Sequence, residues 1–377
     1  MAERAEQDER DPPARVHGGL DARALAARGI EPGSVVDFSV NLNPYGPCEP
    51  VLRAARSAAL DVYPDASAHL ARTRWAEALG CTREHVAVGH GAADLFWAIA
   101  RAVLADGDVA ARGVCARARP KVTIAEPTFS EFRIAAAAAG AEVERVFADP
   151  LHGYRLELSA LVSASRGAVA LYLCSPNNPT GEHMPLARVR ELAAALPDTT
   201  IVLDQSFLAL SDHAHELGAL LSTNAMPDNV LRVRSLTKEF GCPGLRIGLC
   251  VGAPALIRRV EAQRPTWATS GPALAALAVS AGEHAFVQAS WLRMRADRDA
   301  TTQLLRARGL TPRSTATSYQ LVALRGEAGV FCERMLQQGV LLRDCSSFGL
   351  PRHVRVAALP APARARLSQA LDAVGSA

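Results

Sequence analysis

With 377 residues the chain is long enough to bury a large core, and its length suggests two or three domains. Its net charge of +3 is small and the basic residues are spread along the chain, which argues against nucleic-acid binding. Residues 1–13 are charged and lack an apolar core, so neither a secretory signal nor a membrane anchor is expected, and no apolar run approaches a membrane span. The eight cysteines show no CxxC spacing and no clustering with histidine, which predicts reduced, mostly buried thiols and a cytoplasmic location.

The first two thirds of the chain predict an arm followed by alternating strands and helices. The arm has a short helix at 21–28 and a strand at 35–38 and is expected to pack on the small domain. Helical patterns at 66–79 and 92–105 then alternate with short apolar or β-branched runs, at 86–88, 122–125, 168–174, 200–203, 230–233 and 247–251. This alternation predicts an α/β fold with helices on both faces of a mostly parallel sheet, and ligands at the carboxyl ends of its strands.

After residue 252 the pattern changes. A long helical stretch is expected at 272–308, followed by short strands near 320–324, 340–343 and 354–357 and a last helix from residue 361. This order is typical of a smaller α+β domain joined by a long helix. The expected organisation is an N-terminal arm, a large domain and a small C-terminal domain, at residues 1–45, 46–265 and 266–377.

The first motifs follow the strands at 86–88 and 122–125. Gly89-His90-Gly91 opens a helix and would leave the backbone amides of Ala92 and Ala93 free, although the same glycines could close an ordinary turn. A dinucleotide fingerprint needs a third glycine here, so a Rossmann site is the lesser interpretation. Phe129 stands just after the next strand, where core packing alone would explain it.

Two polar motifs follow the next two strands. Residues 175–181, Ser-Pro-Asn-Asn-Pro-Thr-Gly, come after the strand at 168–174 and could simply form a proline- and glycine-rich loop. Asp204 stands at the exit of the strand at 200–203. A carboxylate there could cap a helix, or it could hold a protonated ring nitrogen.

Lys238, shortly after the strand at 230–233, is the most informative residue. Ser235 and Thr237 precede it, a glycine-bearing turn follows, and Arg246 comes eight residues later. An amine that condenses with an aldehyde must be partly unprotonated, which a neighbouring cation and a partly desolvated pocket favour. The two hydroxyls and the guanidinium could bind a phosphate monoester. An aldehyde and a phosphate together indicate pyridoxal phosphate.

Each of these signals has a simpler interpretation when it is taken alone. A lysine between a strand and a glycine turn is most often a solvated surface lysine. Ser235 and Lys238 also match the Ser-x-x-Lys pair of penicillin-binding acyl enzymes, which need a downstream Lys-Thr-Gly that this chain lacks. His213 and His215 suggest a metal, but no third ligand is evident, so no metal site is expected.

Together the motifs resemble the fold type I pyridoxal phosphate enzymes of the class I/II aminotransferase superfamily. Asn-Pro-Thr-Gly, a later aspartate, and Ser-x-x-Lys followed by arginine occur in the family's order over almost the whole chain. The resemblance implies an aspartate-aminotransferase-like fold, with a three-layer α/β/α large domain. It also implies that Lys238 forms the Schiff base, that Asp204 pairs with the pyridine nitrogen, and that Asn178 donates to the phenolic oxygen of the cofactor.

The resemblance assigns further cofactor contacts. Phe129 would stack on the ring, and the phosphate would be held by side chains and backbone amides of Ser235, Thr237, Arg246, Ala92 and Ala93. Tyr63 matches a tyrosine that reaches the phosphate from the partner subunit, so a homodimer is implied. Many members have a tyrosine at the position of Phe207 and a hydroxyl at that of Ala93. These two absences are either subfamily traits or a cause of weaker cofactor retention.

The two ends of the chain resemble the threonine-phosphate decarboxylases, which make aminopropanol phosphate for cobalamin, with the histidinol-phosphate aminotransferases as the nearest sister family. The segments that carry this resemblance are 17–19, 37–46, 342–348 and 354–356. It implies that Arg343 and Arg355 grip the substrate carboxylate. His17 and Asn41 would face the phosphate of the substrate.

The main expectation is therefore a pyridoxal phosphate-dependent lyase that decarboxylates threonine phosphate or a close phosphorylated amino acid. Two guanidiniums can fix the angle between the substrate carboxylate and the cofactor ring. A carboxylate held out of the ring plane leaves as CO2, whereas a carboxylate held in the plane lets the proton leave, as in transamination. The alternative is an aminotransferase for histidinol phosphate or an amino acid of specialised metabolism. A non-catalytic regulator is a third interpretation, against which the retained Lys238, Asp204 and Asn178 argue.

Overall fold

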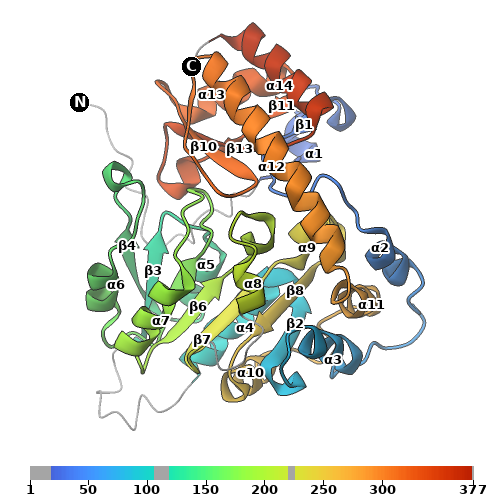
Figure 1. The fold of residues 1–377 in the computed structure, drawn as a ribbon, viewed down its shortest axis with the longest axis vertical. Helices are drawn as coiled ribbons and strands as arrows, with labels where there is room; N and C mark the ends of the chain where they lie inside the picture. The colour runs from blue at the N-terminus through green and yellow to red at the C-terminus, as the bar shows by residue number, and fades with distance from the viewer. Residues whose placement is uncertain (1–17, 106–118, 220–225, 376–377) are drawn as a thin grey trace.

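The computed structural model describes residues 18–105, 119–219 and 226–375 (Figure 1). Its main sheet has seven strands. Its strands are β2 Val86–His90, β3 Lys121–Glu126, β4 Glu142–Phe147, β5 Ala170–Cys174, β6 Thr200–Asp204, β7 Val230–Arg234 and β8 Ile247–Val251. They lie in the order β2, β8, β7, β6, β5, β3, β4. Neighbours are parallel except for β8, which is antiparallel to β2 and β7. The sheet is therefore mostly parallel, as the sequence predicts.

Helices cover both faces of this sheet, namely α3 His69–Ala78, α4 Gly91–Leu104, α5 Glu131–Ala138, α6 Leu158–Ser165, α7 Leu186–Ala195 and α10 Pro254–Glu261. Successive residues of β6 face opposite layers of helices. Val202 belongs to a buried cluster with α4, α5 and α10, whereas Ile201 and Leu203 belong to a cluster with α6 and α7. A strand that is buried on both faces is apolar throughout. The predicted three-layer α/β/α arrangement is confirmed.

The C-terminal part of the chain forms a smaller α+β unit. Its antiparallel sheet has the order β12, β13, β10, β9, with bounds Arg343–Asp344, His353–Ala357, Tyr319–Ala323 and Thr311–Pro312. Its helices are α12 His284–Ala307, α13 Ala328–Gln337 and α14 Ala361–Val374. Val322, Val356 and Leu367 lie in its core.

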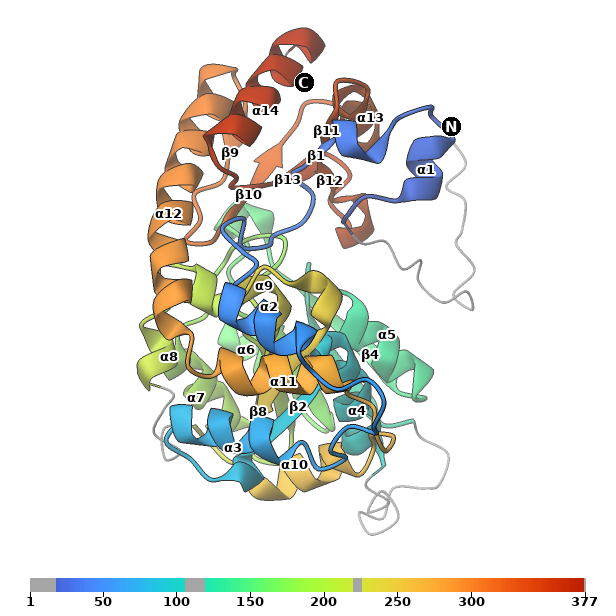
Figure 2. The same cartoon turned by 90° about the vertical axis from the view of Figure 1, so that its right-hand side faces the viewer.

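The N-terminal segment packs on this smaller unit. Strand β1 (Val36–Asp37) pairs in parallel with β11 (Val340–Leu341), and Phe38 is fully buried in the core of the smaller unit. Figure 2 shows the short helix α1 (Ala22–Ala26) beside α13. The chain then descends to α2 (Glu49–Arg56) on the larger unit, so the segment between β1 and α2 joins the two units (Figure 2).

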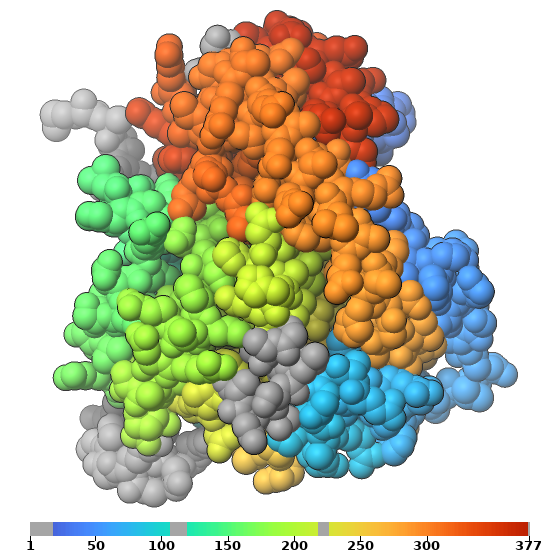
Figure 3. Space-filling model, viewed as in Figure 1, coloured from blue at the N-terminus to red at the C-terminus, as the bar shows by residue number. Residues whose placement is uncertain are grey.

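The helical stretch predicted at 272–308 is two helices rather than one. Helix α11 (Gly271–Ser280) packs with α2 and α3 around the fully buried Trp75, whose indole nitrogen donates to Leu277 O at 3.0 Å. The chain turns at Gly282, a poor helix former, before α12 begins. Figure 3 shows α12 lying across the surfaces of both units. The domain boundary at residue 266 stays a prediction, and the packing of α11 favours a boundary nearer the start of α12.

The strand β4 at the edge of the sheet was not predicted. Its sequence, Glu-Val-Glu-Arg-Val-Phe, is charged and partly exposed because it pairs with β3 on one side only. Charged edge strands of this kind resist pairing with other chains. Among the described residues, no helix combines the length and apolar character that a membrane span requires.

A buried ion pair fixes the turn that carries Lys238. Arg234, the last residue of β7, donates from Nη2 to Glu239 Oε2 at 2.6 Å and from Nε to Glu239 Oε1 at 3.1 Å. Glu239 ends the one-turn helix α9 (Leu236–Glu239), and both side chains are almost fully buried. The pair therefore ties the end of the strand to the helix that presents the lysine.

Replacing Glu239 with glutamine is expected to lower the free energy of unfolding by about 3 kcal/mol, because the buried guanidinium of Arg234 loses its counter-charge. Glu77→Gln is the matched control, since it breaks an exposed pair with Arg74 and should change stability by less than about 1 kcal/mol. Urea denaturation of both variants measures the difference. Equal losses in the two variants would contradict the role given to the buried pair.

Candidate active site

A cavity of about 100 Å³ lies at the carboxyl ends of the main-sheet strands. Nine residues predicted from the sequence line it together: Ala92, Ala93, Phe129, Asn178, Asp204, Ser235, Thr237, Lys238 and Arg246. They come from loops and helix starts after β2, β3, β5, β6 and β7, because parallel strands bring their carboxyl ends to the same edge of a sheet. Phe96, Ser206 and Phe207 complete the lining.

Lys238 is held as an amine that can lose its proton. Its Nζ donates to Ser235 Oγ at 3.1 Å and lies 5.3 Å from the centre of the Phe207 ring. Burial lowers the pKa of the Lys238 ammonium; the nearby Asp204 opposes that shift and Arg246 adds to it. The unprotonated form is the one that attacks an aldehyde.

Asp204 is buried with three hydrogen bonds to its carboxylate. Ser206 donates to Oδ1 from its backbone N at 2.9 Å and from Oγ at 2.5 Å, while the Tyr172 hydroxyl donates to Oδ2 at 3.0 Å. Burial raises the pKa of Tyr172 well above its ordinary value, so this hydroxyl stays a neutral donor. Sequence reasoning missed the roles of Tyr172 and Ser206. The only signal was a hydroxyl in an otherwise apolar strand, at the position of Tyr172.

An anion cradle lies where α4 begins. Helix α4 starts at Gly91 without a side-chain cap, so its first backbone amides have no partner within the helix. A Cβ on Gly91 would come within 2.6 Å of Arg246 Nη2, and one on Gly248 within 2.5 Å of the Gly91 carbonyl carbon. The guanidinium therefore lies directly over the helix start, where Gly91 has a φ of +84°, a conformation that L side chains rarely adopt. The Ser235 and Thr237 hydroxyls, 2.9 Å apart, line the same cavity.

A second group of polar side chains lies next to Asn178. Arg355 of β13 donates to Asn178 Oδ1 and to Ser39 O, and burial lowers the pKa of its guanidinium to about 10. Arg355 Nε and both amide atoms of the buried Asn41 have no hydrogen-bond partner among the described residues. Buried polar groups without partners are costly, so these atoms indicate a place for a polar ligand.

Tyr319 lies between the residues that line the cavity and Arg355, and its role was not predicted from the sequence. Its hydroxyl donates to Asn177 O at 2.7 Å, and its ring packs edge-on against Phe207. The Arg355 guanidinium lies 5.5 Å from the centre of the same ring. Tyr319 therefore packs between Phe207, which lines the cavity, and the Arg355 guanidinium.

Two predicted residues make other contacts, and a third is not among the residues that the structure describes. Arg343 is the register partner of Arg355, but its guanidinium donates to Asp344 O at 2.8 Å and to Ser347 Oγ at 2.7 Å. Tyr63 is 78% exposed and stacks on Trp267, with ring centres 4.4 Å apart. The prediction for His17 falls outside the described residues.

These residues fit pyridoxal phosphate. The lysine amine suits the aldehyde, the cradle at Gly91 suits the phosphate, and the buried Asp204 suits a protonated ring nitrogen. Phe129 lies in the lining with part of its surface exposed, so it can stack on a ring. The fold and the site together therefore define the class of protein, an enzyme that uses pyridoxal phosphate.

Comparison with known proteins gives the family. Residues 33–374 match the model for aminotransferase class I and II. A histidinol-phosphate aminotransferase from Methanopyrus kandleri is 33% identical over 350 residues, which covers 87% of this chain and 85% of that protein. The chain belongs to the aminotransferase class I and II family, and the predicted family and cofactor are confirmed.

Two further comparisons bear on the fold and the reaction. The histidinol-phosphate aminotransferase from Sinorhizobium meliloti, solved with pyridoxal-5'-phosphate, has a TM-score of 0.79 at 24% identity and covers 94% of both chains. A relative from Caldanaerobacter subterraneus, provisionally named a threonine-phosphate decarboxylase, is 29% identical over 317 residues, 82% of this chain and 81% of that protein. The aspartate-aminotransferase-like fold is therefore confirmed.

Proposed function

We propose that the protein is an aminotransferase that moves an amino group between a phosphorylated amine of the histidinol phosphate type and a 2-oxoacid. The observation that carries the proposal is the similarity to the Methanopyrus kandleri histidinol-phosphate aminotransferase, at 33% identity over most of both chains. The buried, partly unpartnered Arg355 supports it, because a guanidinium binds either a carboxylate or a phosphate through two parallel hydrogen bonds. One site could therefore take both substrates in turn.

The residues of the chain divide the work of such a reaction. When bound, pyridoxal phosphate supplies an electron sink for the carbanion at the substrate α carbon. Asp204 holds the proton on the ring nitrogen, and the Gly91 cradle with Arg246 fixes the phosphate. Lys238 Nζ, with its lowered pKa, takes up and returns the proton at the α carbon. Arg355 orients the substrate by its anionic group.

The decarboxylase expected from the sequence takes second place. It is supported by the Caldanaerobacter subterraneus relative, but at 29% identity this similarity is weaker than that to the Methanopyrus kandleri aminotransferase. The expected clamp of two guanidiniums on one carboxylate would also require Arg343 to give up its hydrogen bonds to Asp344 O and Ser347 Oγ. Arg343, Asn41 and His17 stay predicted substrate residues.

A paired assay separates the two reactions. The purified protein with pyridoxal phosphate is incubated with histidinol phosphate and 2-oxoglutarate, and separately with threonine phosphate. We expect glutamate to form in the first mixture and no CO2 to be released in the second. CO2 release from threonine phosphate without glutamate formation in the first mixture would replace the proposal by the decarboxylase.

Replacing Arg355 with alanine is expected to lower kcat/KM for the 2-oxoacid by about 100-fold, because a buried charge that pairs with the substrate is lost. The visible absorption of the bound cofactor should remain, since Arg355 is not among the residues that line the cofactor cavity. Arg352→Ala, an exposed arginine close by in the chain, is the control and should keep its activity. Loss of cofactor binding in Arg355→Ala would contradict this assignment.

The homodimer implied by the resemblance stays a prediction. Tyr63 and Trp267 stack on the surface, and Leu60 and Val62 beside them are also exposed. Exposed apolar groups of this kind are typical of protein interfaces. We expect sedimentation equilibrium to give twice the chain mass of 39.9 kDa. A monomer at micromolar concentration would contradict both the dimer and the proposed contact of Tyr63 with the partner's phosphate.

A further inference from the structure

Two histidines and a glutamate from two separate segments of the larger unit lie close together. His183 lies in the loop after β5, whereas His213 and Glu216 lie in the segment after β6, where Glu216 begins the short helix α8 (Glu216–Ala219). The three potential ligand atoms lie within 4.8 Å of one another. His183 Nε2 is 3.0 Å from Glu216 Oε1, and the His183 and His213 rings stack with centres 3.8 Å apart.

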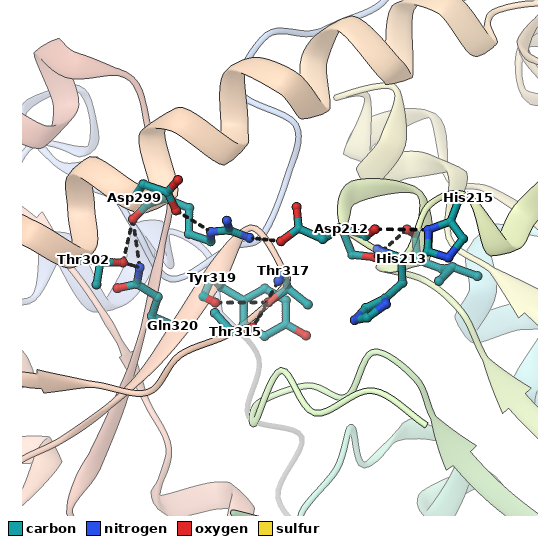
Figure 4. Close-up of polar contacts among 12 residues, drawn as sticks. Asp212, His213, His215, Asp299, Thr302, Thr315, Thr317, Tyr319 and Gln320 are labelled. Carbon is teal, nitrogen blue, oxygen red and sulfur yellow. Dashed lines mark hydrogen bonds and ion pairs between the residues drawn. The ribbon is translucent and has the colours of Figure 1, made fainter. Parts of the chain in front are cut away.

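The spacing in the sequence suggested His213 and His215 as the histidine ligands, but the structure brings His213 together with His183. His213 and His215 are close in the chain, but their ring centres are 6.3 Å apart and Figure 4 shows the two rings turned to different sides. The third ligand that the sequence did not reveal comes from the loop that follows the Asn-Pro-Thr-Gly motif. The fold therefore brings together three potential metal ligands whose spacing in the sequence matches no recognisable motif.

The polar contacts leave the cluster incomplete. Glu216 Oε2 is buried and has no hydrogen-bond partner in the described part of the chain. His183 uses Nδ1 to contact Ser175 Oγ at 3.0 Å, so its Nε2 points at Glu216 and His213. A second hydrogen bond of this kind is what fixes the ring of a metal-binding histidine.

We propose that His183, His213 and Glu216 bind a divalent transition-metal ion of the zinc type, with a fourth position left to water. Two imidazoles and one carboxylate are a ligand set that zinc accepts in tetrahedral geometry. Magnesium and calcium prefer sites made wholly of oxygen ligands, so the two imidazoles select against them. The orphaned Glu216 Oε2 beside the two imidazole rings is the feature that a bound cation would account for.

Such an ion would join two segments that shape the active site. The His183 loop carries Asn178, and the segment with His213 follows Asp204 and Phe207. The second segment also reaches the smaller unit, because Asp212 accepts from Arg298 of α12 at 2.7 Å (Figure 4). The metal would therefore act as a structural cross-link that positions the cofactor pocket, without taking part in the reaction.

Zinc binding is tested on the untagged, full-length protein after treatment with a chelator. We expect the wild type to bind one equivalent of Zn²⁺ and to melt several degrees higher with zinc than without, whereas Mg²⁺ has no effect. His213→Gln should weaken zinc binding by about 100-fold or more, measured by competition with a chromogenic chelator, because it removes one of three ligands. His215→Gln, the neighbouring histidine outside the set, should bind zinc like the wild type.

Glu216→Gln keeps the size of the side chain and provides a second test should His213→Gln fold poorly, which circular dichroism would reveal. It should also lose the rise in Tm with zinc. The proposal is wrong if the wild type binds no zinc, or if His213→Gln and Glu216→Gln bind it as tightly as His215→Gln does. These readouts do not depend on which reaction the enzyme catalyses.

Discussion

Replacing Lys238 with alanine is expected to lower kcat by about 10⁴-fold, the largest loss of any variant considered. The side chain is assigned both the bond to the cofactor aldehyde and the movement of the substrate proton, and no other amine lines the cavity among the described residues. Turnover under saturating substrate and added pyridoxal phosphate measures the loss. The variant should also lack the visible absorption band of the wild-type enzyme.

The sequence provides a strict control, because the chain contains only two lysines, Lys121 and Lys238. Lys121 lies at the start of β3, donates to Ala164 O at 2.7 Å and pairs with Glu144 at 2.9 Å. Lys121→Ala should therefore keep the absorption band and most of the activity. An active Lys238→Ala enzyme, or a colourless Lys121→Ala enzyme, would remove Lys238 from the centre of the mechanism.

Replacing Asp204 with asparagine is expected to lower kcat by about 10³-fold while the cofactor stays bound. The phosphate cradle and the Lys238 side chain remain in place, so affinity should change little. An amide has no negative charge with which to keep the ring nitrogen protonated, so the electron sink is weakened. The measurement is kcat together with the dissociation constant of pyridoxal phosphate.

Asp198→Asn is the control for this change, since Asp198 is exposed just before the start of β6 and Asp204 is buried at its end. It should leave both quantities unchanged. If Asp204→Asn instead kept its kcat and lost the cofactor, Asp204 would be a binding residue and its electronic role would be wrong. The three hydrogen bonds from Ser206 and Tyr172 make that outcome unexpected, because they hold the carboxylate without the cofactor.

The layers of the fold could be predicted because buried parallel strands leave a strong pattern. Runs such as Ile201 to Leu203 are apolar at every position since both faces of β6 are covered. The edge strand β4 has no such run and was missed. The break between α11 and α12 was missed as well, because one glycine in an alanine-rich stretch is a weak signal whose meaning depends on tertiary packing.

The part of the site nearest the sheet could be predicted for the same reason. Asp204 and Lys238 follow strands closely, and strand order alone brings them together. Contacts made between distant segments could not be predicted. The hydroxyls of Tyr172 and Tyr319, and the meeting of His183 with Glu216, depend on side-chain directions that the sequence does not encode locally. The choice between amino transfer and decarboxylation depends on the angle between the substrate and the cofactor ring, and no sequence motif encodes that angle.

The bond between Lys238 and pyridoxal phosphate can be tested directly by borohydride reduction. Reduction fixes the cofactor on the lysine to which it is attached, and mass spectrometry of the digested protein then identifies the labelled peptide. We expect one phosphopyridoxyl group per chain, on the peptide that contains Lys238. A label on Lys121, or no label after incubation with pyridoxal phosphate, would contradict the account.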